Sequence, residues 1–147
     1  MKKVIRVMLA AALLIVLAAC AKKADVRFSD LKLGTGKQEL VKMLGKDYTE
    51  VGTSPYRMIY TGVSLFDFIG KNADTKLTIN MNTEDNAYAY SYYMYKNLDS
   101  NYEKAKSYFE GLYGTAAEGQ NASEIWIDGD HTYYLFKQPD YVAVGVN

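Results

Sequence analysis

The chain has 147 residues, 49% of them hydrophobic and 23% charged, which predicts one modest globular domain and leaves no room for a second independent core. Its 17 basic and 17 acidic residues give a formal net charge of zero. Because nucleic-acid binding relies on clustered Lys and Arg that neutralise phosphates, this composition argues against a nucleic-acid partner.

The first 19 residues have the parts of an export signal. Lys2, Lys3 and Arg6 form a positively charged segment, and an apolar run of 11 residues follows at 7–17. A helix needs roughly 20 apolar residues to cross the hydrocarbon core, so we interpret the run as a signal segment and not as a permanent anchor. Its removal takes three basic residues away and leaves 14 against 17 acidic ones, a mildly acidic mature chain.

The signal segment ends in Leu17-Ala18-Ala19-Cys20, which resembles the lipobox of bacterial lipoproteins. The resemblance implies that the Cys20 thiol receives a diacylglyceryl group, that the chain is cut before Cys20, and that the new amine is often acylated as well. Cys20 is the only cysteine in the sequence, so no intramolecular disulfide competes for it. The alternative is an ordinary secretory signal that happens to contain a cysteine.

Lipidation would attach the chain to a membrane through Cys20, because two or more acyl chains give stable attachment. Residues 21–27 are polar and typical of a short tether. We predict a signal peptide at 1–19, a lipidated tether at 20–27 and a single domain at 28–147. The expected location is the extracytoplasmic side of the cell envelope, on the outer membrane of a Gram-negative organism or the cytoplasmic membrane of a Gram-positive one.

Two capped helices are predicted in the domain. Residues 35–38 match a capping box that starts at Thr35, and Gly45 supplies a left-handed stop. A second capping box starts at Ser100, and Gly114 ends that helix. Its apolar stripe is Tyr102, Ala105, Phe109 and Leu112. The two boxes hint at a duplicated half-unit.

Seven strands are predicted from period-two alternation and turn signals. They lie at 56–60, 64–69, 76–81 and 87–96 between the helices, and at 124–127, 132–137 and 141–146 after the second helix. Short turns between strands imply antiparallel pairing. The predicted fold class is α+β, a two-layer sandwich in which two helices pack a mainly antiparallel sheet in the order α-ββββ-α-βββ, with one sheet face partly open.

Residues 31–46, LKLGTGKQELVKMLGK, resemble the turn and capped helix that open the small envelope lipoproteins related to SmpA/OmlA. SmpA/OmlA is a subunit of the outer-membrane β-barrel assembly machine, and the family shares the β-lactamase-inhibitor-protein-like fold. Asp47 stands where this family commonly has Pro. The resemblance implies a scaffold or binding role without catalysis.

The sequence gives little signal for catalysis. It contains no nucleophile elbow, zinc-binding helix motif or phosphate-binding loop. His131 is the only histidine, and beside the turn at 128–130 we interpret it as an exposed loop residue. Glu124, Asp128 and Asp130 do not have the spacing of a calcium-binding loop. We therefore predict no catalytic residue, no metal and no cofactor.

Tyrosine is the most unusual feature of the composition, with 14 residues, five of them within 87–95. Alternation places Tyr88, Tyr90 and Tyr92 on one strand face and the small residues of 87–91 on the other. Because a helix packs most closely over small residues, we predict that the three tyrosines face outward as candidate partner-binding residues. The alternative is that these rings fill the core.

Three functions are compatible with these patterns. The first is a non-catalytic envelope lipoprotein that binds another protein or a cell-wall component through its sheet. The second is a small-ligand or lipid-binding lipoprotein that uses a concave aromatic sheet face. The third is an enzyme with an unrecognised carboxylate site.

We expect Cys20→Ser to abolish membrane attachment of the chain, because no other segment is predicted to hold it at a bilayer. Fractionation of cells into membrane and soluble material measures this, with Ala21→Ser as a neighbouring control that keeps the cysteine. Undiminished membrane partitioning of Cys20→Ser would contradict the lipoprotein assignment.

Overall fold

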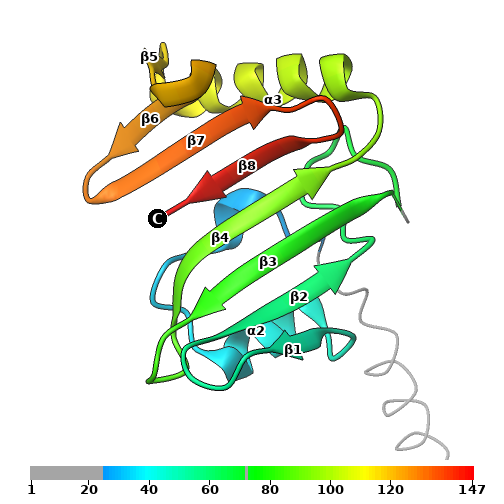
Figure 1. Ribbon diagram of the computed structural model, residues 1–147, viewed down its shortest axis with the longest axis vertical. Helices are drawn as coiled ribbons and strands as arrows, with labels where there is room; N and C mark the ends of the chain where they lie inside the picture. Colours follow the sequence, from blue (N-terminus) through cyan, green and yellow to red (C-terminus); the bar gives the residue numbers. More distant parts are fainter. Residues whose placement is uncertain (1–24, 72) are drawn as a thin grey trace, which may run out of the picture.

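The computed structural model describes residues 25–71 and 73–147, which form an eight-stranded antiparallel sheet packed by two α-helices (Figure 1). The strand order is β1-β2-β3-β4-β8-β7-β6-β5. The predicted α+β class, with helices packed on an antiparallel sheet, is confirmed. In chain order the elements are η1 (Phe28–Asp30), α2 (Lys37–Leu44), β1 (Thr49–Val51), β2 (Tyr56–Thr61), β3 (Thr75–Met81), β4 (Ala87–Met94), α3 (Leu98–Tyr113), β5 (Ala117–Glu118), η2 (Gln120–Ala122), β6 (Glu124–Asp128), β7 (His131–Lys137) and β8 (Val142–Val146).

The chain repeats one arrangement twice, a helix followed by four strands that each pair with the next. Helix α2 precedes β1 to β4, and α3 precedes β5 to β8. The two halves meet where β4 pairs with β8. The half-unit is therefore duplicated in the fold, and the predicted order lacks the two-residue strand β5.

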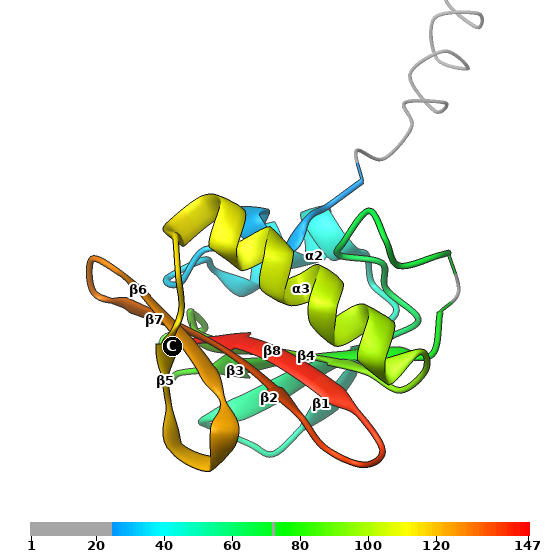
Figure 2. The same ribbon diagram turned by 90° about the horizontal axis from the view of Figure 1, so that it is seen from above.

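Both helices cover the same face of the sheet, which we call the helix side, and we call the opposite face the outer face. Figure 2 shows α2 and α3 on one side, with the sheet beneath them. In β2, Met58 and Tyr60 are buried on the helix side, whereas Arg57 is exposed on the outer face. The core therefore lies between the sheet and the helices, and the predicted open sheet face is present.

A segment predicted as a strand instead fills the space between the helices. Residues 64–69 belong to no strand of the described chain, yet Leu65 and Phe66 are buried. The Phe66 ring stacks on Phe28 at 5.6 Å between centroids and meets Phe109 of α3 edge-on at 6.4 Å. The strand prediction for 64–69 is wrong because a short apolar run indicates burial and does not by itself indicate sheet pairing.

Helix α2 ends as predicted but begins differently. Gly45 and Gly114 both follow their helices with positive φ, as a left-handed stop requires. At the start of α2, the Lys37 N–H donates to the Asp85 carbonyl at 2.9 Å. The predicted side-chain cap at Thr35 is wrong, because the β3–β4 turn takes its place and the Thr35 hydroxyl donates to a carbonyl three residues earlier.

Helix α3 begins at Leu98, two residues before the predicted cap at Ser100. Asn97 precedes it in the left-handed conformation, with φ 51°. The Asn101 side-chain amide donates to the Lys96 carbonyl at 2.8 Å and fastens the first turn. The predicted capping box at Ser100 is wrong because this residue already lies inside the helix.

Two further differences concern exposed residues. Strand β1 is exposed along its whole length, so it lacks the alternation that would have predicted it. Leu112, predicted in the apolar stripe of α3, is 52% exposed. Tyr113 packs inward in its place and stacks on Tyr133 of β7 at 4.7 Å between centroids.

We expect Phe66→Ala to lower the free energy of unfolding by about 3–5 kcal/mol, because the buried ring joins the loop to η1, β4 and α3. Urea unfolding measures the change. Phe68→Ala is the matched control, since this partly buried ring stacks on Phe66 alone among the described aromatic side chains. If Phe66→Ala lowers the free energy of unfolding no more than Phe68→Ala does, the Phe66 ring does not contribute to the stability of the core in this way.

Candidate functional site

The predicted outward row of Tyr88, Tyr90 and Tyr92 does not form. Tyr88 is 51% exposed, but Tyr90 and Tyr92 are fully buried on the helix side. Ala87 and Ala89 pair with consecutive residues of β3, which leaves Tyr88 as the extra residue of a β-bulge. The prediction that Tyr90 and Tyr92 face outward is therefore wrong, and both rings belong to the core.

These inner tyrosines span the space between the sheet and the segments packed on it. The Tyr90 hydroxyl donates to the Lys32 carbonyl at 2.8 Å, and the Tyr92 hydroxyl donates to the Val63 carbonyl at 2.7 Å. Small side chains would leave this space empty, which is the physical reason why the rings face the helices. Burial raises the pKa of Tyr90 to about 12 and also raises the pKa of Tyr92.

The outer face carries a different group of aromatic side chains, which we call the outer aromatic cluster: Tyr93, Tyr95, Tyr134, Phe136 and Tyr141. Tyr93 meets Tyr141 edge-on at 5.5 Å between centroids and lies parallel to Tyr95 at 6.4 Å. Phe136 lies 6.0 Å from Tyr134 and 5.9 Å from Tyr141. The five rings form one continuous surface on the face that neither α2 nor α3 covers.

Sequence reasoning missed this cluster although alternation contained the signal. Tyr93 and Tyr95 fall on the strand face opposite Tyr92, and that face was predicted to lie under a helix because Ala89 and Ser91 are small. In the structure, an aromatic ring from β7 takes the position that we had predicted for the helix.

That ring belongs to Tyr134, which lies across the glycine of the neighbouring strand. A Cβ atom added at Gly145 would stand 1.9 Å from the Tyr134 Cζ atom, so only glycine leaves room for the ring. The Tyr134 and Ser91 hydroxyls share a hydrogen bond of 2.8 Å. Burial is the main reason why the pKa of Tyr134 is raised. Small residues of β4 and β8, Ser91 and Gly145, therefore leave the space on the outer face that the Tyr134 ring occupies.

The strands carry cations on both faces, since Lys137 of β7 pairs with Asp99 on the helix side, but they carry acidic side chains on one face only. Lys76 lies over the Tyr93 ring at 4.5 Å from its centroid and near Tyr95 at 5.8 Å, a cation–π arrangement. Arg57 is a second cation on the outer face. By the register of the ladders, the acidic residues of the described strands all lie on the helix side: Glu50, Glu118, Glu124 and Asp128. The outer face is therefore aromatic and cationic in a domain that has an excess of acidic residues.

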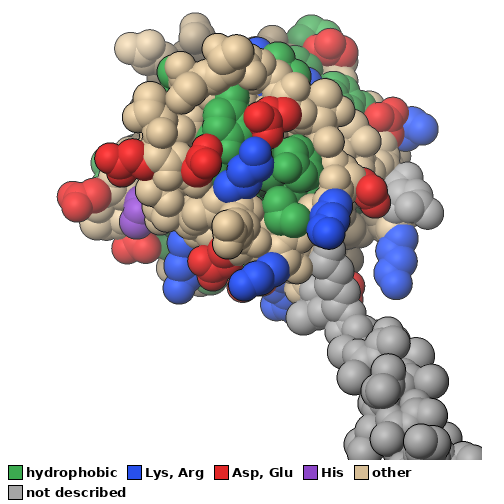
Figure 3. Space-filling view, turned by 90° about the horizontal axis from the view of Figure 1, so that it is seen from below, with side chains coloured by type: hydrophobic (Ala, Val, Ile, Leu, Met, Phe, Trp, Pro, Cys, Tyr) green, Lys and Arg blue, Asp and Glu red, His purple; other side chains and the backbone are tan. Residues whose placement is uncertain are grey.

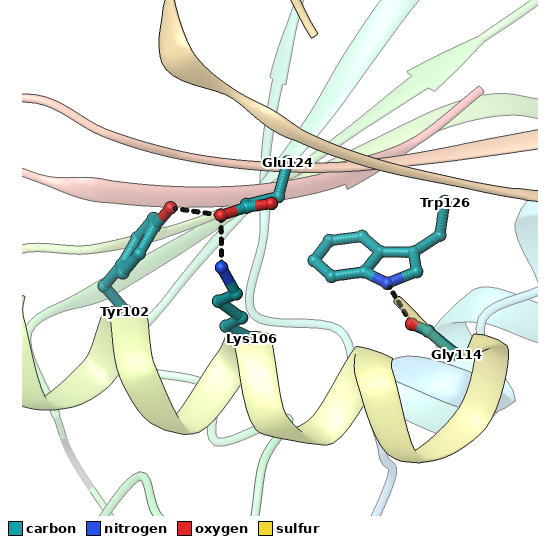
Figure 4. A network of polar contacts seen from close by, with 5 residues as sticks. All are labelled: Tyr102, Lys106, Gly114, Glu124 and Trp126. Carbon is teal, nitrogen blue, oxygen red and sulfur yellow. Dashed lines mark hydrogen bonds and ion pairs between the residues drawn. The ribbon is translucent and has the colours of Figure 1, made fainter. Parts of the chain in front are cut away.

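A polar network fastens α3 to the edge of the sheet on the helix side (Figure 4). The Lys106 ammonium donates to Glu124 Oε1 at 2.5 Å, and the Tyr102 hydroxyl donates to the same oxygen at 3.2 Å. The buried Trp126 donates from Nε1 to the Gly114 carbonyl at 2.9 Å. Burial raises the pKa of Tyr102, and the hydrogen bond to Glu124 raises that of Lys106. Each of these groups has a partner within the fold, so the network positions β6 against α3.

A groove of about 380 Å³ lies on the helix side, beside the β6–β7 turn. Asp128 and His131 lie on its wall together with the stacked rings of Tyr113 and Tyr133. Burial and a hydrogen bond to Tyr133 raise the pKa of Tyr113. His131 is the first residue of β7 and is partly buried, so its interpretation as an exposed loop residue is wrong.

The end of the molecule that carries α2 and β1 has a mixed surface. In Figure 3, acidic and basic side chains are interspersed around separate hydrophobic patches. Two of the ion pairs in this half of the chain join Lys37 to Glu50 at 2.7 Å and Arg27 to Asp67 at 3.3 Å. Charges of both signs therefore neutralise one another locally on this end.

The predicted lipidation site, Cys20, lies outside the described residues. Across 25–71 and 73–147, no helix is long and apolar enough to cross a membrane. In the same part of the chain, no group of three or more His, Cys, Asp or Glu side chains is placed to hold a metal ion.

We expect the free energy of unfolding to fall as the pH rises from about 10 to about 12. Burial raises the pKa of Tyr60 and Tyr90 to about 12, whereas tyrosine in an unfolded chain ionises near 10. The folded chain therefore keeps protons that the unfolded chain releases, so this stabilisation is complete below pH 10 and is lost as the pH passes through 12.

Urea unfolding across this pH interval, on the wild type and on Tyr90→Phe, measures the effect. The variant is expected to lose less stability over the interval than the wild type. Tyr88→Phe changes an exposed ring and should keep the wild-type pH dependence. The same pH dependence in Tyr90→Phe as in the wild type would contradict the assignment to Tyr90.

Comparison with protein-family models, with curated proteins and with solved structures finds no match to this chain. The similarity of residues 31–46 to the SmpA/OmlA lipoproteins is therefore a prediction that depends on this motif. The candidate site is defined by the geometry of the outer face.

Proposed function

We propose that this chain is an envelope-anchored, non-catalytic lipoprotein whose domain binds another protein through the outer face of its sheet. The lipobox resemblance at Cys20 supports the anchor, and the outer aromatic cluster supports the binding role. In this proposal the fold is a scaffold that presents the outer face, and the lipid holds the scaffold at the envelope.

The outer aromatic cluster is the observation that carries the binding role. An antiparallel sheet commonly packs one face on the core and turns a polar face to water. Here the uncovered face carries five contacting aromatic rings, and Ile127 of β6 beside them is 72% exposed. Aromatic residues are enriched in protein interfaces because a large rigid ring is buried at low entropic cost.

The charges of the outer face indicate the chemistry of the partner. Lys76 and Arg57 lie on this face, and the acidic residues of the described strands lie on the other one. Complementary charges across an interface favour the correct partner and exclude surfaces of like charge. A fitting partner surface therefore combines acidic side chains with apolar or aromatic ones.

Binding of a small ligand is a second candidate, supported by the groove beside His131. Its volume of about 380 Å³ falls within the range of small-ligand pockets, and Tyr113 and Tyr133 give it aromatic walls. This groove lies on the helix side, so a ligand there would not occupy the sheet face that the sequence had indicated for a ligand.

A photo-reactive amino acid placed on each side of the domain tests the protein-binding proposal. Ile127 on the outer face and Leu112 on α3 are both large aliphatic side chains that are well exposed, at 72% and 52%. Cross-linking in the native envelope is expected to give one discrete protein adduct from position 127 and none from position 112. Adducts from position 112 alone would place the interface on the helix side and contradict the proposal.

Substitutions within the outer face then test its energetics on the cross-linked partner. We expect Tyr93→Ala to weaken binding by about 2 kcal/mol, the size typical of a central interface aromatic, and Lys76→Glu to weaken it through charge reversal. Glu103→Lys, an exposed charge reversal on α3, is the control. Unchanged affinity in both outer-face variants would show that the partner does not bind the outer face.

A further inference from the structure

We infer that the lipid anchor and the binding face lie on opposite sides of the domain, so that the helix side faces the bilayer and the outer face points away from it. This inference rests on the proposed function, which supplies the lipid on Cys20 and the binding role of the outer face. It adds an orientation that neither the anchor nor the face defines alone.

The described chain starts on the helix side. Figure 2 shows its first residues rising between α2 and α3, away from the sheet. The Phe28 N–H donates to the Leu65 carbonyl at 2.9 Å, and the Phe28 ring meets Phe109 of α3 edge-on at 6.0 Å. Phe28 is 2% exposed, and the partly buried Val26 packs against the same core. The chain is therefore fixed to the helix side from Val26 onward.

Few residues separate this fixed point from the lipid. Five residues lie between Cys20 and Val26, and a chain of that length spans no more than about 20 Å even when fully extended. The membrane surface must therefore lie close to the place where the chain enters the helix side.

The outer face is too far from that place to reach the same membrane surface. The shorter way around the sheet runs along its strands. The longest strand, β4, has eight residues and is about 26 Å long, so even this path measures about 13 Å from the middle of the strand to its end. The helices add a layer about 10–12 Å thick. A chain of about 20 Å cannot follow this path around the domain to the outer face, so the helix side faces the bilayer.

Single cysteines test this orientation in the lipidated protein, reconstituted into phosphatidylcholine vesicles that carry a nitroxide quencher on the lipid headgroups. Acylation occupies the thiol of Cys20, the only native cysteine, so an introduced cysteine is the sole site for a fluorescent label. Lys42→Cys on α2 and Ser107→Cys on α3 report on the helix side, and both positions are exposed. Thr61→Cys and Ile127→Cys are the matched exposed positions on the outer face.

The expected result is a larger loss of fluorescence at positions 42 and 107 than at 61 and 127. Equal losses at all four positions, or larger losses on the outer face, would overturn the orientation. Flotation of the same samples with the vesicles separates this result from the anchor itself. If the protein floats with the vesicles but shows no such difference, the anchor is supported and the proposed orientation is wrong. If the protein does not float, both the anchor and the orientation are wrong.

Discussion

The antiparallel pairing of β4 with β8 is the contact on which the rest of the structure depends. Five residue pairs join the two strands, from Tyr90 with Val146 to Met94 with Val142. Without this ladder, each half would be a four-stranded sheet with one helix and an exposed edge in place of the seam. With the ladder in place, the only edges of the sheet are the short strands β1 and β5, which offer little backbone for further pairing.

The same seam gives the two faces of the sheet their different characters. On the helix side it sets Tyr92 against Val144, and both are buried in the core. On the outer face it sets Ser91 against Gly145, and the small side chains leave room for rings from the neighbouring strand. The β4 segment therefore has tyrosines on both faces of the sheet. The inner ones donate to loop carbonyls, and the outer ones pack on one another.

Local signals predicted much of the fold. The glycine stops at Gly45 and Gly114, the turn near Gly129 and the positions of strands β3 and β8 depend on residues that are close in sequence, so the sequence pattern predicts them. The true start of α2 could not be predicted, because the Asp85 carbonyl that accepts from the Lys37 N–H comes from a turn that is distant in sequence. The exposed strand β1 has no pattern to detect.

The candidate site was less predictable for a related reason. Alternation correctly separates Tyr92 from Tyr93, but it does not state which of the two faces the helices cover. That choice depends on the width of the space beneath them, which Tyr90 and Tyr92 fill and which alanine and serine would leave empty. The β-bulge at Tyr88 adds a break that no local pattern marks.

The burial of Phe28 also decides how the domain carries mechanical load. A pull on its N-terminal end enters at Phe28 and passes through the rings of Phe66 and Phe109, across the layers and not along the strands. We expect tension in this direction to load the contacts between the loop and the helices first, then the hydrogen bonds that join residues 34–35 to Ala87 of β4, and the β4–β8 ladder only after these.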